Sequence, residues 1–268
     1  MRTLVAAEPG TPGHDNEDVA VFGQGMFVVA DGLTARTDTG CSHGVAWFAN
    51  ELSTAVLTHS DLGPRGALAA AIRDTAALHC DTCDLQHPAT PCAAVAIVHI
   101  TEQFVRYLVL GDVTVVIDVG RAMAISDPRI TRTARAERHA ADALPADAPG
   151  KAEALLRMKR AELADRNTDA GYWIAGADPT VVDHAVSGEV PRSAVQRVAI
   201  LTDGAARVVE TFKLYDWAGV LDALATSGPV ELIALVRDTE RADPDTTKWP
   251  RNKVSDDAAV IYCDGISP

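Results

Sequence analysis

Short apolar runs of β-strand type, separated by pairs of helical segments, are the feature that most restricts how this 268-residue chain can fold. Three such runs follow one another at residues 93–100, 105–110 and 113–119, with only a few residues between them. Links this short suit antiparallel neighbours, so we predict an antiparallel meander there. Further short strands are predicted at 3–7, 26–30, 198–201 and 258–262.

Helical periodicity fills most of the intervals between these strands. Helices are predicted over 43–57, 66–79, 151–166, 214–226 and 230–237. In these segments apolar residues recur at helical spacing, or residues that break a helix are lacking. Strand groups separated by helix pairs predict an α+β fold, with sheets in the middle and helices outside.

Length and composition are consistent with one domain over residues 1–268, because 47% hydrophobic residues can form a substantial core. The stretch 132–149 is rich in Ala, Asp, Pro and charge, and we expect a variable flap or insert around 128–170.

Charge and hydropathy argue against several classes of partner. The net charge of −13, from 24 Lys and Arg against 37 Asp and Glu, disfavours nucleic acid and anionic membranes. No apolar run reaches the ~18 residues of a membrane span, and the N-terminus lacks a secretory pattern, so we predict a cytoplasmic protein. Five cysteines at irregular spacing do not suggest a disulfide framework.

Carboxylates occur at the edges of four predicted strands. The pairs are Glu17-Asp18, Asp31-Gly32, Asp203-Gly204 and Asp256-Asp257. An isolated Asp-Gly after a strand is most often a turn. Four acidic sites in one chain instead favour side chains that converge at the rim of a sheet, where their oxygens suit divalent cations such as Mg²⁺.

The order of these motifs carries a resemblance to a known family. Asn16-Glu17-Asp18, Val29-Ala30-Asp31-Gly32, Leu110-Gly111-Asp112, Leu201-Thr202-Asp203-Gly204 and Asp256-Asp257-Ala258-Ala259-Val260 occur in sequence across nearly the whole chain. This series resembles that of the PP2C-type (PPM) metal-dependent protein phosphatases. The resemblance implies an αββα sandwich, two antiparallel sheets flanked by helix pairs, and two Mn²⁺ or Mg²⁺ ions as cofactors.

The resemblance also implies roles for individual residues. Asp31 would bridge the two cations, and Asp31 and Asp203 are the predicted catalytic centre. The predicted metal ligands are Glu17, Asp31, the Gly32 carbonyl, Asp203 and Asp256, with Asp18 and Asp257 just outside the ligand set. Asp127 is a candidate ligand of a third cation.

The chain departs from the family pattern where phosphate would bind. Gly13 stands at the position where the family commonly has an Arg four residues before the motif Glu. Candidate replacements are Arg36, Arg251 and Lys253; an Arg is favoured over the Lys because its planar fork matches phosphate oxygens.

Thiol and imidazole groups are concentrated in residues 79–92. Cys80, Cys83, His87 and Cys92 come close to a zinc-knuckle spacing, but the interval before His87 is one residue short and the expected glycines are missing. We therefore interpret these cysteines as buried or loop thiols.

Together these features predict a hydrolase, a metal-dependent phosphatase in which metal-activated water attacks a phosphate monoester. Phosphoserine or phosphothreonine in a protein is the substrate that the resemblance implies. Two alternatives remain open: a phosphorylated small molecule as substrate, or a catalytically weak regulatory relative that binds a partner.

Overall fold

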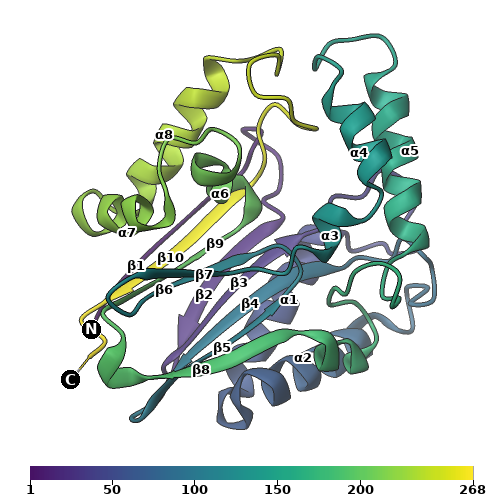
Figure 1. Cartoon of the computed structure of the whole chain (residues 1–268). Coiled ribbons are helices and arrows are strands. Elements are labelled where there is room, and N and C mark those ends of the chain that lie inside the picture. Colours follow the sequence, from purple (N-terminus) through teal and green to yellow (C-terminus); the bar gives the residue numbers. More distant parts are fainter. Residues whose placement is uncertain (268) are drawn as a thin grey trace.

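Two five-stranded antiparallel sheets packed face to face form the centre of the protein in a computed structural model (Figure 1). The structure describes residues 1–267, so Pro268, the last residue of the predicted domain, lies outside it. The first sheet has the order β1-β10-β9-β6-β7 and the second β2-β3-β4-β5-β8. The strands are β1 Arg2–Glu8, β2 Asp18–Gly23, β3 Met26–Gly32, β4 Ala93–Ile100, β5 Phe104–Leu110, β6 Thr114–Asp118, β7 Ala122–Ile125, β8 Val186–Pro191, β9 Arg197–Leu201 and β10 Ala258–Asp264.

Helices cover the outer face of each sheet. The helices are α1 Val45–Thr58, α2 Gly63–His79, α3 Arg129–Arg132, α4 Arg135–Asp142, α5 Lys151–Ala164, α6 Asp203–Glu210, α7 Trp217–Thr226 and α8 Pro229–Arg241. Helices α1 and α2 pack on the second sheet and α6 to α8 on the first, as Figure 1 shows. Short 3-10 turns lie at Ser60–Leu62, Pro179–His184 and Arg192–Ala194. No helix of the described chain is both long and apolar enough to cross a membrane.

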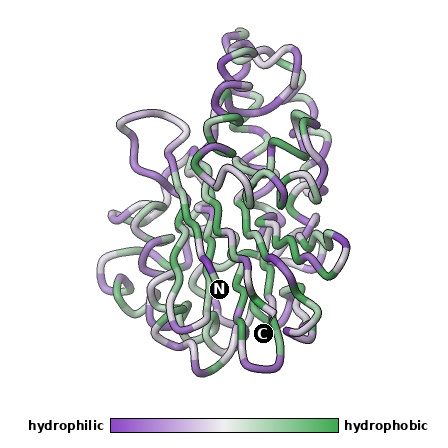
Figure 2. Tube along the Cα trace, turned by 90° about the vertical axis from the view of Figure 1, so that its left-hand side faces the viewer, coloured by the Kyte–Doolittle hydropathy of each residue, from purple (hydrophilic) through white to green (hydrophobic). Residues whose placement is uncertain are grey.

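The central strands are apolar on both faces because both faces are covered. In β3, Val29 joins the core between the sheets, whereas its neighbour Val28 packs under α1 and α2. Successive side chains point to opposite sides of a strand, so a run without alternation is what a doubly covered sheet requires. The hydrophobic strands accordingly run through the middle of the molecule in Figure 2. The predicted α+β sandwich is confirmed.

The predicted three-strand meander is wrong at its third strand. Strands β4 and β5 pair as expected, but β6 pairs with β9 and β7 in the other sheet. Gly111 makes the crossing possible: its φ is +91°, and a Cβ there would lie 2.5 Å from the Cβ of Ala94. The chain therefore leaves β5 in a direction that most residues disfavour.

Strands β7 and β8 and helices α3, α4 and α6 were not predicted. Strand β7 has only four residues, and β8 is largely exposed without clean alternation. Helix α6 begins at Asp203, in the Asp-Gly pair that was placed at the end of a predicted strand, with no helix predicted after it.

The predicted flap contains regular structure. Residues 129–164 form α3, α4 and α5, and a small cluster of Ala141, Ala154, Leu155 and Met158 packs α4 against α5. In Figure 1 this helix pair stands beyond one end of the sheets, across from α8. It is therefore placed to cover the sheet edge where the acidic motifs lie.

The loop 242–255 is held by a buried ion pair. Arg251 Nη1 lies 2.5 Å from Asp243 Oδ2, and the two side chains are 4% and 2% exposed. Burial raises the pKa of Asp243, but the Lys248 and Trp249 N–H groups and Arg251 outweigh it and leave the pKa lowered. This pair fixes the loop that leads into Asp256.

Asp243→Asn should destabilise the protein by about 3–5 kcal/mol, because it leaves the buried Arg251 guanidinium without its charge partner. The free energy of unfolding measured in urea checks this, with the exposed Asp245→Asn as a control expected to cost about 1 kcal/mol or less. Because the pKa of Asp243 is lowered in the folded state, its ion pair stabilises the protein at pH values above the unfolded pKa of Asp243. This stabilisation is lost as pH falls through the folded pKa. An equal loss in both variants would contradict the role of the pair.

Candidate active site

Four of the predicted acidic segments meet at one end of the sandwich. Asp18 at the start of β2 lies directly opposite Asp31 in β3. Asp203 opens α6, and Asp256 precedes β10. One cavity is lined by Asp31, Gly32, Asp203 and Asp256 together with Asp112.

Two glycines let these segments approach. A Cβ on Gly32 would lie 2.7 Å from the Glu17 carbonyl oxygen, and one on Gly204 would lie 1.8 Å from that of Asp257. Neither distance is compatible with a side chain. The glycines of the two Asp-Gly motifs are thus needed for close backbone contact between the acidic segments.

The carboxylates repel one another in surroundings that exclude water. Burial raises the pKa values of Asp18 and Asp31 well above the ordinary range, and neighbouring carboxylates, Asp256 for Asp18 and Asp18 for Asp31, raise them further. Burial also raises the pKa of Asp203, with Asp256 adding to it. Burial with repulsion from Asp203 raises that of Asp112 to about 7.

This donor set fits a hard divalent cation. The Oδ2 atom of Asp18 is buried and has no hydrogen-bond partner in the part of the chain that the structure describes. Such an orphaned oxygen is costly unless a cation or water satisfies it. Oxygen-only ligands that carry negative charge are the environment that Mg²⁺ and Mn²⁺ prefer.

Asp257 lies outside the cavity lining and holds two backbone groups. Its Oδ1 accepts a hydrogen bond from Gly10 N (2.7 Å), and its Oδ2 accepts one from Glu17 N (2.6 Å). The Glu17 carboxylate in turn accepts a hydrogen bond from the Thr34 hydroxyl. Asp257 therefore positions Glu17 through the main chain.

Two positively charged side chains, Lys253 and Arg207, contact Asp256. Lys253 Nζ lies 2.5 Å from Asp256 Oδ1 and donates to Thr34 Oγ1 at 2.9 Å. Arg207 Nη2 lies 3.2 Å from Asp256 Oδ2, and its Nη1 donates to Glu240 at 2.6 Å. Burial lowers the pKa of Lys253, but attraction to Asp256 outweighs it and leaves the pKa raised.

The insert closes the opposite side of the cavity. Arg138 from α4 and Lys159 and Glu162 from α5 line it, with Ile130 and Met158. Arg138 forms an ion pair with Glu162, whose other oxygen lies 3.9 Å from Lys159 Nζ. The sequence offered no motif for these residues, because their helices carry no pattern beyond periodicity and charge.

The structure separates the remaining candidates. Arg36 lines the cavity and makes no side-chain hydrogen bond to any of residues 1–267. Lys253, ranked below the arginines on sequence grounds, lines it too. The Arg251 guanidinium instead binds Asp243 and the carbonyls of Trp249 and Val254.

Asp127, the candidate ligand of a third cation, is 2% exposed and paired with Arg129 at 2.5 Å. It does not line the cavity, whereas Asp112 does. Asp112 belongs to the Leu110-Gly111-Asp112 motif, from which no role for this carboxylate was predicted.

Comparison with solved structures identifies the fold. The chain aligns over 98% of its length with the catalytic domain of the serine/threonine protein phosphatase PstP in complex with two manganese ions, covering 97% of that chain at a TM-score of 0.56 and 15% identity. The alignment with the serine/threonine phosphatase Stp1 from Staphylococcus aureus has a TM-score of 0.56 and 11% identity, and it covers 98% of this chain and 94% of Stp1. The PPM Ser-Thr phosphatase MsPP from Mycobacterium smegmatis, in complex with cacodylate, gives 0.53 at 17% identity, with 98% of each chain covered.

No protein-family model and no curated protein matches the sequence. At these identities the likeness shows the fold alone, and the chain has the fold of the PPM serine/threonine phosphatases. The resemblance predicted from the motif order is confirmed at that level.

Mn²⁺ should raise the melting temperature more at pH 8 than at pH 5.5. Because the pKa values of these carboxyl groups are raised in the folded state, bound protons stabilise the fold at pH values below the unfolded pKa values. This stabilisation is lost as pH rises through the folded pKa values; the folded pKa of Asp112 is about 7. A bound cation would replace those protons. Differential scanning fluorimetry at both pH values measures the shift, and Asp203→Asn should reduce it; an unchanged shift in that variant would contradict cation binding here.

Proposed function

We propose that the protein is a metal-dependent phosphatase that hydrolyses phosphate monoesters. The observation that carries the proposal is the cavity itself, whose lining combines clustered carboxylates with four cationic side chains, Arg36, Arg138, Lys159 and Lys253. The carboxylates suit divalent cations, and the cationic side chains suit a phosphate dianion. The shared fold with manganese-containing PstP supports it.

Asp31, Asp203 and Asp256 would hold the cations, together with Glu17 and the Gly32 carbonyl. When bound, two such ions supply a water of lowered pKa as nucleophile and positive charge for the phosphate oxygens. Asp257 would keep Glu17 in place through the backbone contacts described above. For an additional cation, Asp112 is better placed than Asp127, because it faces Asp203 in the same cavity.

Phosphate oxygens that the carboxylate-bound cations do not reach need other positive groups. Arg36 is the best candidate, because it lines the cavity and has no carboxylate partner among residues 1–267. Lys159 and Arg138 on the insert are further candidates, although both are near Glu162. An anchor on the insert would compensate for the missing Arg at position 13.

A phosphorylated protein side chain is the proposed substrate class, by analogy with the serine/threonine phosphatases that share the fold. One observation favours a regulatory, weakly catalytic protein instead. Asp256 is already neutralised by Lys253 and Arg207, which is an arrangement that can persist without a cation.

Turnover of p-nitrophenyl phosphate should require Mn²⁺ or Mg²⁺ and should stop in excess EDTA. Asp31→Asn and Asp203→Asn should each lower kcat by about 100-fold or more, because each removes a ligand charge. Circular dichroism verifies that the variants fold, and Asp15→Asn, an exposed carboxylate of the neighbouring loop, is the matched control. Full activity in EDTA would refute the metal-dependent mechanism. No activity with any divalent metal would refute the proposed phosphatase function and favour the regulatory alternative.

Arg36→Ala should raise KM for a phosphopeptide about tenfold with a small change in kcat, since the guanidinium would bind phosphate in ground and transition states alike. Arg36→Lys should recover only part of the loss, because Lys lacks the planar fork. Steady-state kinetics measure both, with exposed Arg73→Ala on α2 as the control. A KM within about twofold of wild type would move the anchor to Lys159 or Arg138, whose Ala variants are then tested in the same way.

A further inference from the structure

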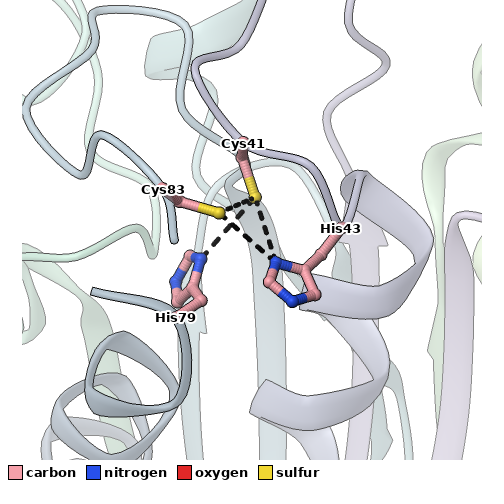
Figure 3. A group of neighbouring side chains, drawn as sticks. All are labelled: Cys41, His43, His79 and Cys83. Atoms are coloured by element: carbon pink, nitrogen blue, oxygen red, sulfur yellow. Dashed lines mark hydrogen bonds between the residues drawn. The ribbon is translucent and has the colours of Figure 1, made fainter. Parts of the chain in front are cut away.

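Two thiols and two imidazoles, which are common metal ligands, point toward one another between the start of α1 and the end of α2 (Figure 3). Cys41 and His43 lie in the loop that leads into α1, His79 ends α2, and Cys83 lies in the turn that follows. One ligand atom from each residue lies within 4.8 Å of the other three. None of the four lines the acidic cavity.

Their spacing is close to that of a tetrahedral zinc site. Zn–S bonds of about 2.3 Å and Zn–N bonds of about 2.0–2.1 Å put the ligand atoms of a tetrahedron about 3.3–3.8 Å apart. Cys41 Sγ lies 3.6 Å from His79 Nδ1 and 3.8 Å from His43 Nδ1, and Cys83 Sγ lies 3.3 Å from His43 Nδ1. The two sulfur atoms, 3.1 Å apart, would need to separate by about 0.7 Å.

The surrounding structure holds the imidazoles at this position. His79 is 2% exposed although it is polar, and it lies at the end of the buried face of α2. The Trp47 ring stacks on His43 at 4.3 Å between centroids and meets His79 edge-on at 5.1 Å. The two ligand-bearing loops are also joined by a backbone hydrogen bond of 2.8 Å from Asp84 N to Gly40 O.

We propose that Cys41, His43, His79 and Cys83 form a Zn²⁺ site of the Cys₂His₂ type. Four protein ligands fill a tetrahedral shell, so the site is structural and leaves no position for a substrate. Both thiols release their protons to solvent when they bind as thiolates, and no oxidation is involved. The site is independent of the proposed phosphatase function.

Such an ion would clamp the helix hairpin at the end near the cavity. It would tie the start of α1 to the end of α2 and would also fix the loop 33–44, which begins at β3. The first part of that loop carries Leu33, Thr34 and Arg36, which line the cavity. The clamp would therefore limit the motion of the proposed phosphate anchor.

The test is zinc content and cobalt absorption of the full chain purified under reducing conditions. We expect about one tightly held zinc per chain by elemental analysis, and after Co²⁺ exchange the sulfur-to-cobalt charge-transfer and strong visible bands of tetrahedral thiolate coordination. Carboxylates of the active site cannot give the sulfur bands. Cys41→Ser and His43→Ala should each weaken zinc binding by more than about tenfold, and Cys41→Ser should also lower the intensity of the sulfur bands, because only one thiolate remains.

Controls come from the same segment. Cys80→Ser and His87→Ala, whose side chains lie outside the group, should keep zinc and both sets of bands. Removal of zinc from the wild type with a chelator should change the tryptophan fluorescence, to which Trp47 contributes, and lower the melting temperature, which tests the site even where a variant folds poorly. The proposal is overturned if the wild type holds no zinc and gives no sulfur bands, if Cys41→Ser retains them at full intensity, or if mass spectrometry of the reduced preparation shows a Cys41–Cys83 disulfide.

Discussion

Repulsion among buried carboxylates is the constraint around which this structure is organised. Antiparallel register puts Asp18 opposite Asp31, and glycine contacts bring in the segments that carry Glu17 and Asp256. Unpaired charges of one sign are costly to bury, so the surroundings must oppose them. Lys253 and Arg207 supply part of the opposing charge, and a divalent cation of the kind proposed above would supply the remainder. The doubly covered sandwich provides the rigid edge on which this arrangement can persist.

The fold was largely predictable because its signal is local. Apolar runs without alternation, such as Val28-Val29, reveal strands covered on both faces, and the helical repeats reveal the layers that cover them. Pairing is less local: β5 and β6 are separated by three residues but lie in different sheets, because Gly111 turns the chain across the sandwich. Short or exposed elements such as β7 and β8 lack the periodicity that would have identified them.

The candidate site was predictable only where motifs mark it. The acidic positions follow from strand ends, and the cavity does contain Asp31, Asp203 and Asp256. Arg138 and Lys159 come from an insert whose packing no short motif specifies. The thiols show the same limit, since proximity in sequence groups Cys83 with Cys80 and His87, whereas the α1–α2 hairpin groups it with Cys41 and the two histidines.

The contact between Lys253 and Asp256 would couple binding of a cation in the cavity to binding of an anion there. The Lys253 ammonium group contacts Oδ1 of Asp256, a carboxylate that a bound divalent cation would also need. The cation and Lys253 would therefore compete for Asp256. Displacement of the lysine would free a positive charge beside the position of an incoming anion. Binding of the cation and of the anion would then be cooperative, and by reciprocity the anion would tighten the hold on the ion by the same factor. The cation and the anion would therefore each bind most tightly when the other is present.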